Sequence, residues 1–103
     1  MKECDATTEE LIMKAGLDAP RLTPQHIQDT VKKTEFFKLT DVLTVAVVTL
    51  QNGFTVTGES ACASPENYDK TIGEKIAREN AAEKIWLLEG YLLKQKLFEM
   101  SQK

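Results

Sequence analysis

The amino-acid sequence predicts an α+β fold: two short N-terminal helices, an antiparallel β-hairpin and a long C-terminal amphipathic helix. Three observations predict it: a start punctuated by helix caps and breakers, a β-branched run that contains Asn52-Gly53, and apolar residues at helical spacing from Ile72 onward. With 103 residues, the chain is long enough for one self-supporting domain, 1–103. We expect three parts in chain order, a helical part at 1–35, the hairpin at 36–60 and the long helix at 64–100.

The first short helix is predicted over 8–15. Thr7 and Glu10 have the spacing of a capping box, in which two side chains satisfy free N–H groups at the start of a helix. Gly16 then supplies a residue type that commonly ends a helix in the left-handed conformation.

The second short helix is predicted over 24–33. Thr23 can cap it, and Pro24 suits the first helical position because its φ is fixed and it has no N–H group to leave unpaired. Its apolar face consists chiefly of Ile27 and Val31, so this helix must dock on another part of the protein.

The hairpin is predicted from Asn52-Gly53, because a two-residue type I′ turn needs positive φ at both central residues. With this loop, Gln51 lies opposite Phe54. The side of the ribbon that carries this pair is then the core side, with the apolar residues Val45, Val47, Phe54 and Val56.

The other side of the ribbon is still apolar on its first strand, at Val42, Val48 and Leu50. An isolated two-stranded ribbon is marginally stable, and a long apolar edge invites pairing. We therefore expect the N-terminal helices or a second copy of the chain to cover this side, which favours a homodimer.

The long helix is predicted to begin with Ser64 as its cap and Pro65 at its first position. Apolar residues then return at spacings of three to five, at Ile72, Ile76, Ala81, Ile85, Leu88 and Leu92. At 1.5 Å per residue the helix is about 50 Å long, which exceeds the length of the hairpin. Gly90 either lets a partner helix approach or breaks the helix.

Beyond Ile85 the apolar surface is wider than one stripe requires, which predicts a second contact surface. Tyr and Trp are enriched in binding hot spots, although at helical spacing they also build cores and homodimer seams. Both interpretations apply to the candidate interaction residues Trp86, Tyr91, Leu93, Leu97 and Phe98.

Composition excludes several classes of function. The net charge is −3 and the basic residues are scattered, so nucleic-acid binding is not expected. No apolar run approaches 18 residues and the start lacks a secretory signal, so we expect a cytoplasmic protein without a membrane span. Cys4, Cys62 and His26 are too few and too far apart for a metal site or a disulfide framework, and no cofactor is implied.

The block NGFTVTGESACASPENYDKTIGEKIARENAAEKIWLLEGYLLK, residues 52–94, resembles the signature of a small family of tailed-phage and prophage proteins. The family is known from a Shigella podovirus and a coliphage, and its function is generally unassigned. The similarity is specific because the dissimilar submotifs TGESACASPEN, KIARENA and LEGYLLK occur in order. It implies an accessory phage protein that acts inside the bacterium, and it brings no catalytic residues.

The segment before the long helix has two interpretations. As a site, Ser60, Cys62 and Ser64 line a helix N-terminus that attracts an anion such as a nucleotide phosphate, with Arg78 supplied across an interface. As a junction, Ser64 caps the helix and Gly58 lets the helix approach the strand. The junction is favoured because three acids surround the proposed anion site, Glu59, Glu66 and Asp69.

The function predicted from these residues is that of a non-catalytic phage accessory protein that binds and modulates a bacterial host protein. The alternative is an oligomer that binds or sequesters a small nucleotide signal at the helix N-terminus. The third is a Cys62-dependent enzyme, which is disfavoured because His26 is the sole imidazole and nothing in the sequence places it beside Cys62. We expect no enzymatic activity.

Overall fold

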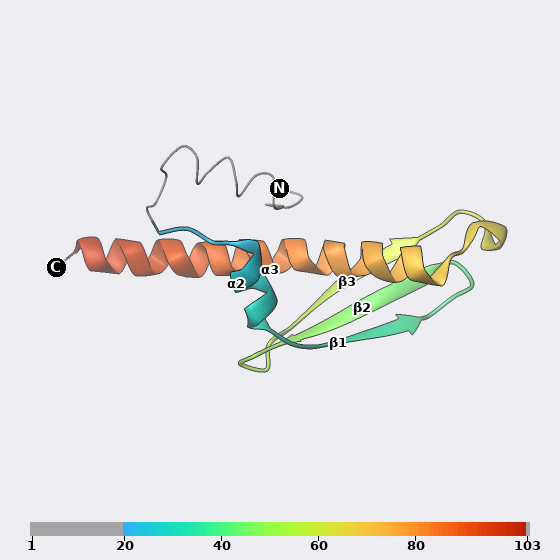
Figure 1. Ribbon diagram of the computed structural model, residues 1–103, viewed down its shortest axis with the longest axis horizontal. Helices are drawn as coiled ribbons and strands as arrows, with labels where there is room; N and C mark the ends of the chain where they lie inside the picture. The colour runs from blue at the N-terminus through green and yellow to red at the C-terminus, as the bar shows by residue number, and fades with distance from the viewer. Residues whose placement is uncertain (1–19, 103) are drawn as a thin grey trace.

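The structure, a computed structural model, describes residues 20–102 (Figure 1). A three-stranded antiparallel sheet, in the order β1-β2-β3, carries the long helix α3 across one face, and α3 continues well past the end of the sheet (Figure 1). The elements are α2 (Pro24–Thr30), β1 (Val31–Lys38), β2 (Leu43–Leu50), β3 (Thr55–Ala61), the 3-10 helix η1 (Pro65–Asn67) and α3 (Lys70–Ser101). The α+β class and the long C-terminal helix are confirmed, whereas the helix predicted over 8–15 lies outside the described residues.

Helix α2 begins as the sequence predicts. The Thr23 hydroxyl accepts a hydrogen bond of 3.1 Å from the backbone N–H of His26, and Pro24 occupies the first turn. The predicted end at residue 33 is wrong, because Val31 adopts extended backbone angles and the chain continues directly into a strand.

Strand β1 was not predicted. It pairs with β2 along its length, and Glu35, for example, lies opposite Val47. Its sequence, VKKTEFFK, has too few apolar residues at strand spacing to be recognised, and its lysines are typical of the edge of a sheet, where charge discourages further pairing. The predicted two-stranded hairpin is therefore corrected to a three-stranded sheet, and it is β2 that lies in the centre.

The turn between β2 and β3 is one residue longer than predicted. Leu50 N–H donates to the Phe54 carbonyl at 2.8 Å, and Gly53 N–H donates to the Leu50 carbonyl at 2.9 Å. Only Gly53 has positive φ, at 92°, so the loop is a three-residue turn that ends in a left-handed glycine. Leu50, and not Gln51, therefore lies opposite Phe54.

The buried face of the sheet also differs from the prediction. Ala46, Val48 and Leu50 are buried beneath α3, whereas Val45 and Val47 lie on the outer face and are only half-buried. Because side chains alternate along a strand, assigning β2 to the wrong side moves all of its residues together. Of the four predicted core residues, Val56 alone is buried, and Phe54 is exposed.

Helix α3 lies unusually close to β3. A Cβ atom added at Gly58 would overlap the backbone of Ala77 and Ala81, so only glycine fits at this crossing. The buried face of the first half of α3 consequently consists of small residues, and the larger Ile72 and Ile76 point away from the core. The proposed role of Gly58 in helix approach is confirmed.

The core lies where α2, the sheet and the middle of α3 meet. Its buried members are Ile27, Val48, Leu50, Val56, Ala81, Ile85 and Trp86. Helix α3 is continuous through Gly90, where a Cβ atom would meet Leu22 only at an ordinary contact distance of 3.9 Å. The predicted start at Ser64 is wrong: Ser64 precedes the 3-10 turn η1, and α3 begins at Lys70.

Candidate functional site

The segment before α3 is held by its own polar groups. The Ser64 hydroxyl donates a hydrogen bond to the Glu66 carboxylate. This bond is the largest cause of a lowered pKa of the Glu66 carboxyl, and a hydrogen bond from the backbone N–H of Glu66 is the second cause. The Asp69 carboxylate accepts a bond of 3.0 Å from the Ile72 N–H and caps α3. An acid therefore already occupies the helix N-terminus where a ligand anion was considered.

Two of the predicted ligand residues share a small hollow. Ser60 and Cys62 line a cavity of about 120 Å³ between the end of β3 and the start of α3, together with Tyr68. The Tyr68 hydroxyl lies 3.4 Å from the hydroxyl of the buried Thr44, and Lys38 stacks over the Tyr68 ring at 4.2 Å. Ligand pockets usually measure at least 300 Å³, so this hollow suits a few waters rather than a nucleotide.

The other two predicted ligand residues lie elsewhere. Arg78 lines a separate groove of about 410 Å³ between β1 and α3, and the floor of that groove is apolar, with Val31, Val48 and Ile85. Ser64 is engaged with Glu66. The four residues Ser60, Cys62, Ser64 and Arg78 are thus not gathered into one site by a single chain.

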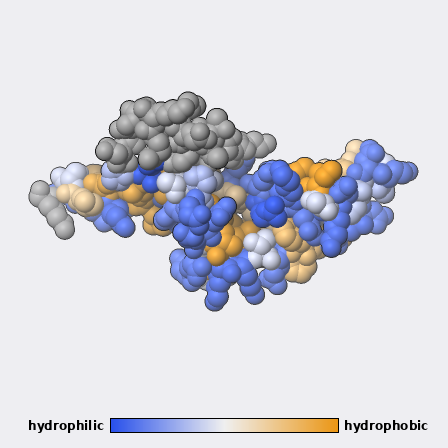
Figure 2. Space-filling model, in the orientation of Figure 1, coloured by the Kyte–Doolittle hydropathy of each residue, from blue (hydrophilic) through white to orange (hydrophobic). Residues whose placement is uncertain are grey.

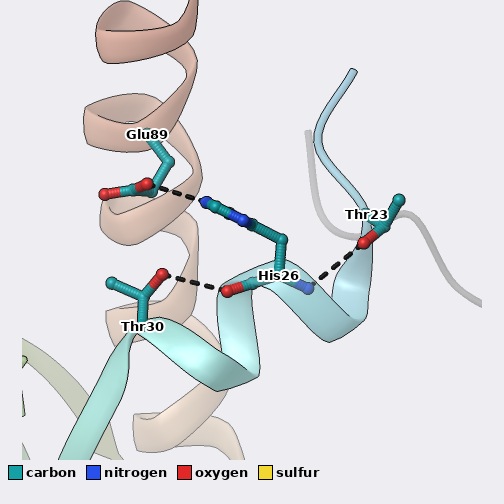
Figure 3. Close-up of polar contacts among 4 residues, drawn as sticks. All are labelled: Thr23, His26, Thr30 and Glu89. Carbon is teal, nitrogen blue, oxygen red and sulfur yellow. Dashed lines mark hydrogen bonds and ion pairs between the residues drawn. The ribbon is translucent and has the colours of Figure 1, made fainter. Parts of the chain in front are cut away.

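The His26 side chain contacts α3 and not Cys62. Its Nε2 atom lies 2.9 Å from Oε1 of Glu89, and its backbone carbonyl accepts a bond from the Thr30 hydroxyl (Figure 3). Helix α2 crosses the middle of α3, whereas the segment that carries Cys62 lies at the far end of the sheet (Figure 1). The structure does not bring Cys62 and His26 together.

The second half of α3 carries several large exposed apolar side chains. Leu87, Tyr91 and Phe98 are exposed to 71%, 70% and 53%, and their spacing of four and seven residues places them on one side of the helix. We call these three residues the distal α3 surface. Hydrophobic residues are visible on the surface along this part of the molecule in Figure 2.

The predicted interaction residues divide between this surface and the core. Tyr91 and Phe98 are exposed, Leu93 and Leu97 are half-buried, and Trp86 is a core residue beside Ile85. Leu87 lies in the wide apolar stretch that the sequence predicts as a second contact surface, and it is the most exposed member of the distal α3 surface.

Neither a cluster of metal-ligand side chains nor a membrane-spanning helix is found in residues 20–102. Within this range, histidine, cysteine and carboxylate side chains form no cluster of three or more that could hold a metal ion. None of the helices described is long and apolar enough to cross a membrane.

The comparisons with known proteins give a family. A model of the family described as phage protein (N4 Gp49/phage Sf6 gene 66) matches residues 22–97, about three quarters of the chain. The chain belongs to this phage protein family. The matched range covers α2, all three strands and α3 through Leu97, so the sheet-and-helix unit is the part that the family shares. No curated protein and no solved structure matches the chain.

Proposed function

We propose that this phage protein binds and modulates a bacterial host protein without catalysing a reaction, in the cytoplasm of the infected or lysogenic cell. The observation that supports this most is the distal α3 surface, where Leu87, Tyr91 and Phe98 are more than half exposed on a rigid helix. Exposed apolar side chains gathered on one face of a soluble protein mark binding surfaces. The helix is already formed, so binding need not order it.

The expected mode of binding is a helix that lies in an apolar groove of the partner. Residues at i, i+4 and i+11 are the anchors such a groove accepts, and Leu87, Tyr91 and Phe98 have this spacing. Lys94 is exposed between Tyr91 and Phe98 in the sequence, so a groove with an acidic rim suits this surface best.

The alternatives receive less support from the geometry. A small nucleotide signal would meet the Asp69 cap and the Glu66 carboxylate near the start of α3, and Arg78 lines a different groove of the same chain. A cysteine enzyme would need a base, and His26 contacts Glu89 instead of Cys62. A thermal shift with cyclic nucleotides would favour the first alternative over host binding.

The test is affinity capture from host lysate with the tagged wild-type chain and two matched variants. Leu87→Lys places a charge on the distal α3 surface, whereas Ile72→Lys changes another apolar residue of the same helix that is more than half exposed but lies outside that surface. We expect a host protein that is retained by the wild type and by Ile72→Lys and is lost with Leu87→Lys. The purified host protein should then bind Leu87→Lys at least tenfold more weakly.

Two results of this experiment would contradict the proposed function. If no protein is retained specifically by the wild type, or if the retained protein binds all three chains equally, the proposed function is wrong. Mass spectrometry of small molecules in the same eluates reports the ligand-binding alternative.

A further inference from the structure

The face of α3 that packs on the sheet continues past the end of the sheet. Ala77 and Ala81 are fully buried on this face, and steps of seven and eleven residues from Ala81 lead to Leu88 and Leu92, which are 37% and 57% exposed. Figure 1 shows that α3 extends beyond the strands here. We call the continued stripe the pairing face, with residues Lys84, Leu88, Leu92, Gln95 and Glu99.

The spacing of this stripe is that of a helix–helix seam. Its members follow one another at four, four, three and four residues, close to the alternation of three and four that keeps one side of a helix against another helix. We propose that a second copy of the chain packs antiparallel along the pairing face, with the two-fold axis between Tyr91 and Leu92.

The charges at the two ends of the pairing face favour a second copy of the chain in the antiparallel orientation. Lys84 and Glu99 stand at equal distances in sequence from the midpoint between Tyr91 and Leu92, so a two-fold antiparallel pair places Lys84 of each copy opposite Glu99 of the other. Among the described residues, neither side chain forms an ion pair within its own chain. A parallel pair in register would instead place like charges together, which is unfavourable.

The middle of the seam is apolar. The same symmetry sets the Leu92 side chains of the two copies beside each other at the axis, and it sets Leu88 opposite Gln95 of the partner subunit. Residues 84–99 form about 24 Å of helix, enough for four turns of contact. Beside the seam, a hollow of about 590 Å³ lined in part by Leu22, Leu92 and Gln95 has room for side chains of the second helix.

The sheet presents one more exposed apolar side chain. Phe54 lies opposite Leu50 and so projects from the same face of the sheet, toward α3, yet it is exposed. It stands at the end of the sheet from which the distal half of α3 emerges.

This pairing leaves the distal α3 surface free. Leu88, Leu92 and Glu99 each directly follow Leu87, Tyr91 and Phe98, so the two sets lie about 100° apart around the helix. The inference therefore goes beyond the proposed function and does not depend on it, and a dimer would present two copies of the host-binding surface.

The test measures molar mass by light scattering and the dimer dissociation constant by sedimentation. The wild-type chain should have twice the 11.6 kDa mass of one chain, and Leu92→Glu should be a folded monomer by circular dichroism. Lys84→Glu and Glu99→Lys should each weaken the dimer about fivefold or more, because each change affects two ion pairs. The double variant Lys84→Glu/Glu99→Lys should recover most of the wild-type affinity, and Lys94→Glu, off the face, should change nothing.

Each other result overturns the inference. A dimer that survives Leu92→Glu uses another interface, and a double variant that is weaker than both single variants excludes the antiparallel register. If the chain is monomeric and dimerises only after residues 1–19 are removed, its own N-terminal segment covers the pairing face. If the chain is monomeric both with and without residues 1–19, the pairing face binds a different protein. Capture of a host protein by a wild-type chain that proves to be monomeric would keep the proposed function while this inference fails.

Discussion

The two halves of α3 bury and expose opposite kinds of side chain. From Lys70 to Ala82 the helix buries small residues against the sheet and exposes the larger Ile72 and Ile76, whereas beyond Trp86 it exposes large side chains where no strand lies beneath it. Close packing at Gly58 explains the first half, since there is no room for large side chains between the helix and β3. In this helix, therefore, close packing accounts for the exposed apolar residues above the sheet and not for those beyond its end.

The largest effect on the free energy of unfolding is expected at Gly58, where α3 packs closest to β3. Gly58→Ala should destabilise the fold by about 3 kcal/mol or more, because the new Cβ atom overlaps helix backbone, which cannot rotate away. Gly90→Ala is the matched control, since its Cβ atom meets only the Leu22 side chain, and it should stabilise the helix by up to about 1 kcal/mol. Urea unfolding monitored by circular dichroism measures both, and equal effects would refute the close crossing.

The second prediction concerns two isoleucines that the sequence assigned to the same stripe. Ile85→Ala removes a fully buried side chain and should cost about 3 kcal/mol of unfolding free energy. Ile72→Ala removes one that is mostly exposed and should change stability by less than about 0.5 kcal/mol. Similar losses for the two variants would mean that the first half of α3 is packed differently.

The third prediction separates the predicted cap from the observed one. Asp69→Ala removes the side chain that accepts the Ile72 N–H and should cost about 1 kcal/mol. Ser64→Ala should cost much less, because the Ser64 side chain makes no cap bond to the 3-10 turn that follows it. The same unfolding experiment decides the order, and a larger loss for Ser64→Ala would restore the helix start expected from the sequence.

The smallest effect is a pH dependence at the junction. The folded pKa of Glu66 is lowered, so its contribution to stability is present above the unfolded pKa and is lost as the pH falls through the folded pKa. Ser64→Ala should raise the pKa of Glu66 toward its ordinary value, which NMR titration of the carboxyl carbon measures. An unchanged pKa would show that the hydrogen bond from Ser64 does not form in solution.

Much of the fold follows from local chemistry in the sequence. The cap at Thr23, the turn at Asn52-Gly53 and the long periodic segment each produce the predicted element, because each depends on residues that are neighbours in the chain. Strand β1 depends instead on pairing with β2, and its own composition does not require it. The register of the hairpin depends on whether the left-handed Gly53 is the second or the third loop residue, which the dipeptide does not specify.

The candidate site was predictable to a smaller extent. The exposed Tyr91 and Phe98 were identified, and the hollow beside Ser60 and Cys62 is real but small. For Trp86 the sequence left a core position and a contact surface both open, because helical spacing does not reveal which side of the helix α2 covers; the structure places it in the core. That information comes only from the tertiary contact of α2 with α3.

The central claim is that α3 is a structural element in its first half and a binding surface in its second. The most direct measurement is the unfolding free energy of the variant Leu87→Ser/Phe98→Ser, which removes two large apolar side chains from the distal α3 surface. If these residues serve a partner, the value stays within about 0.5 kcal/mol of the wild type. A loss of 2 kcal/mol or more would place them in the core and contradict the claim.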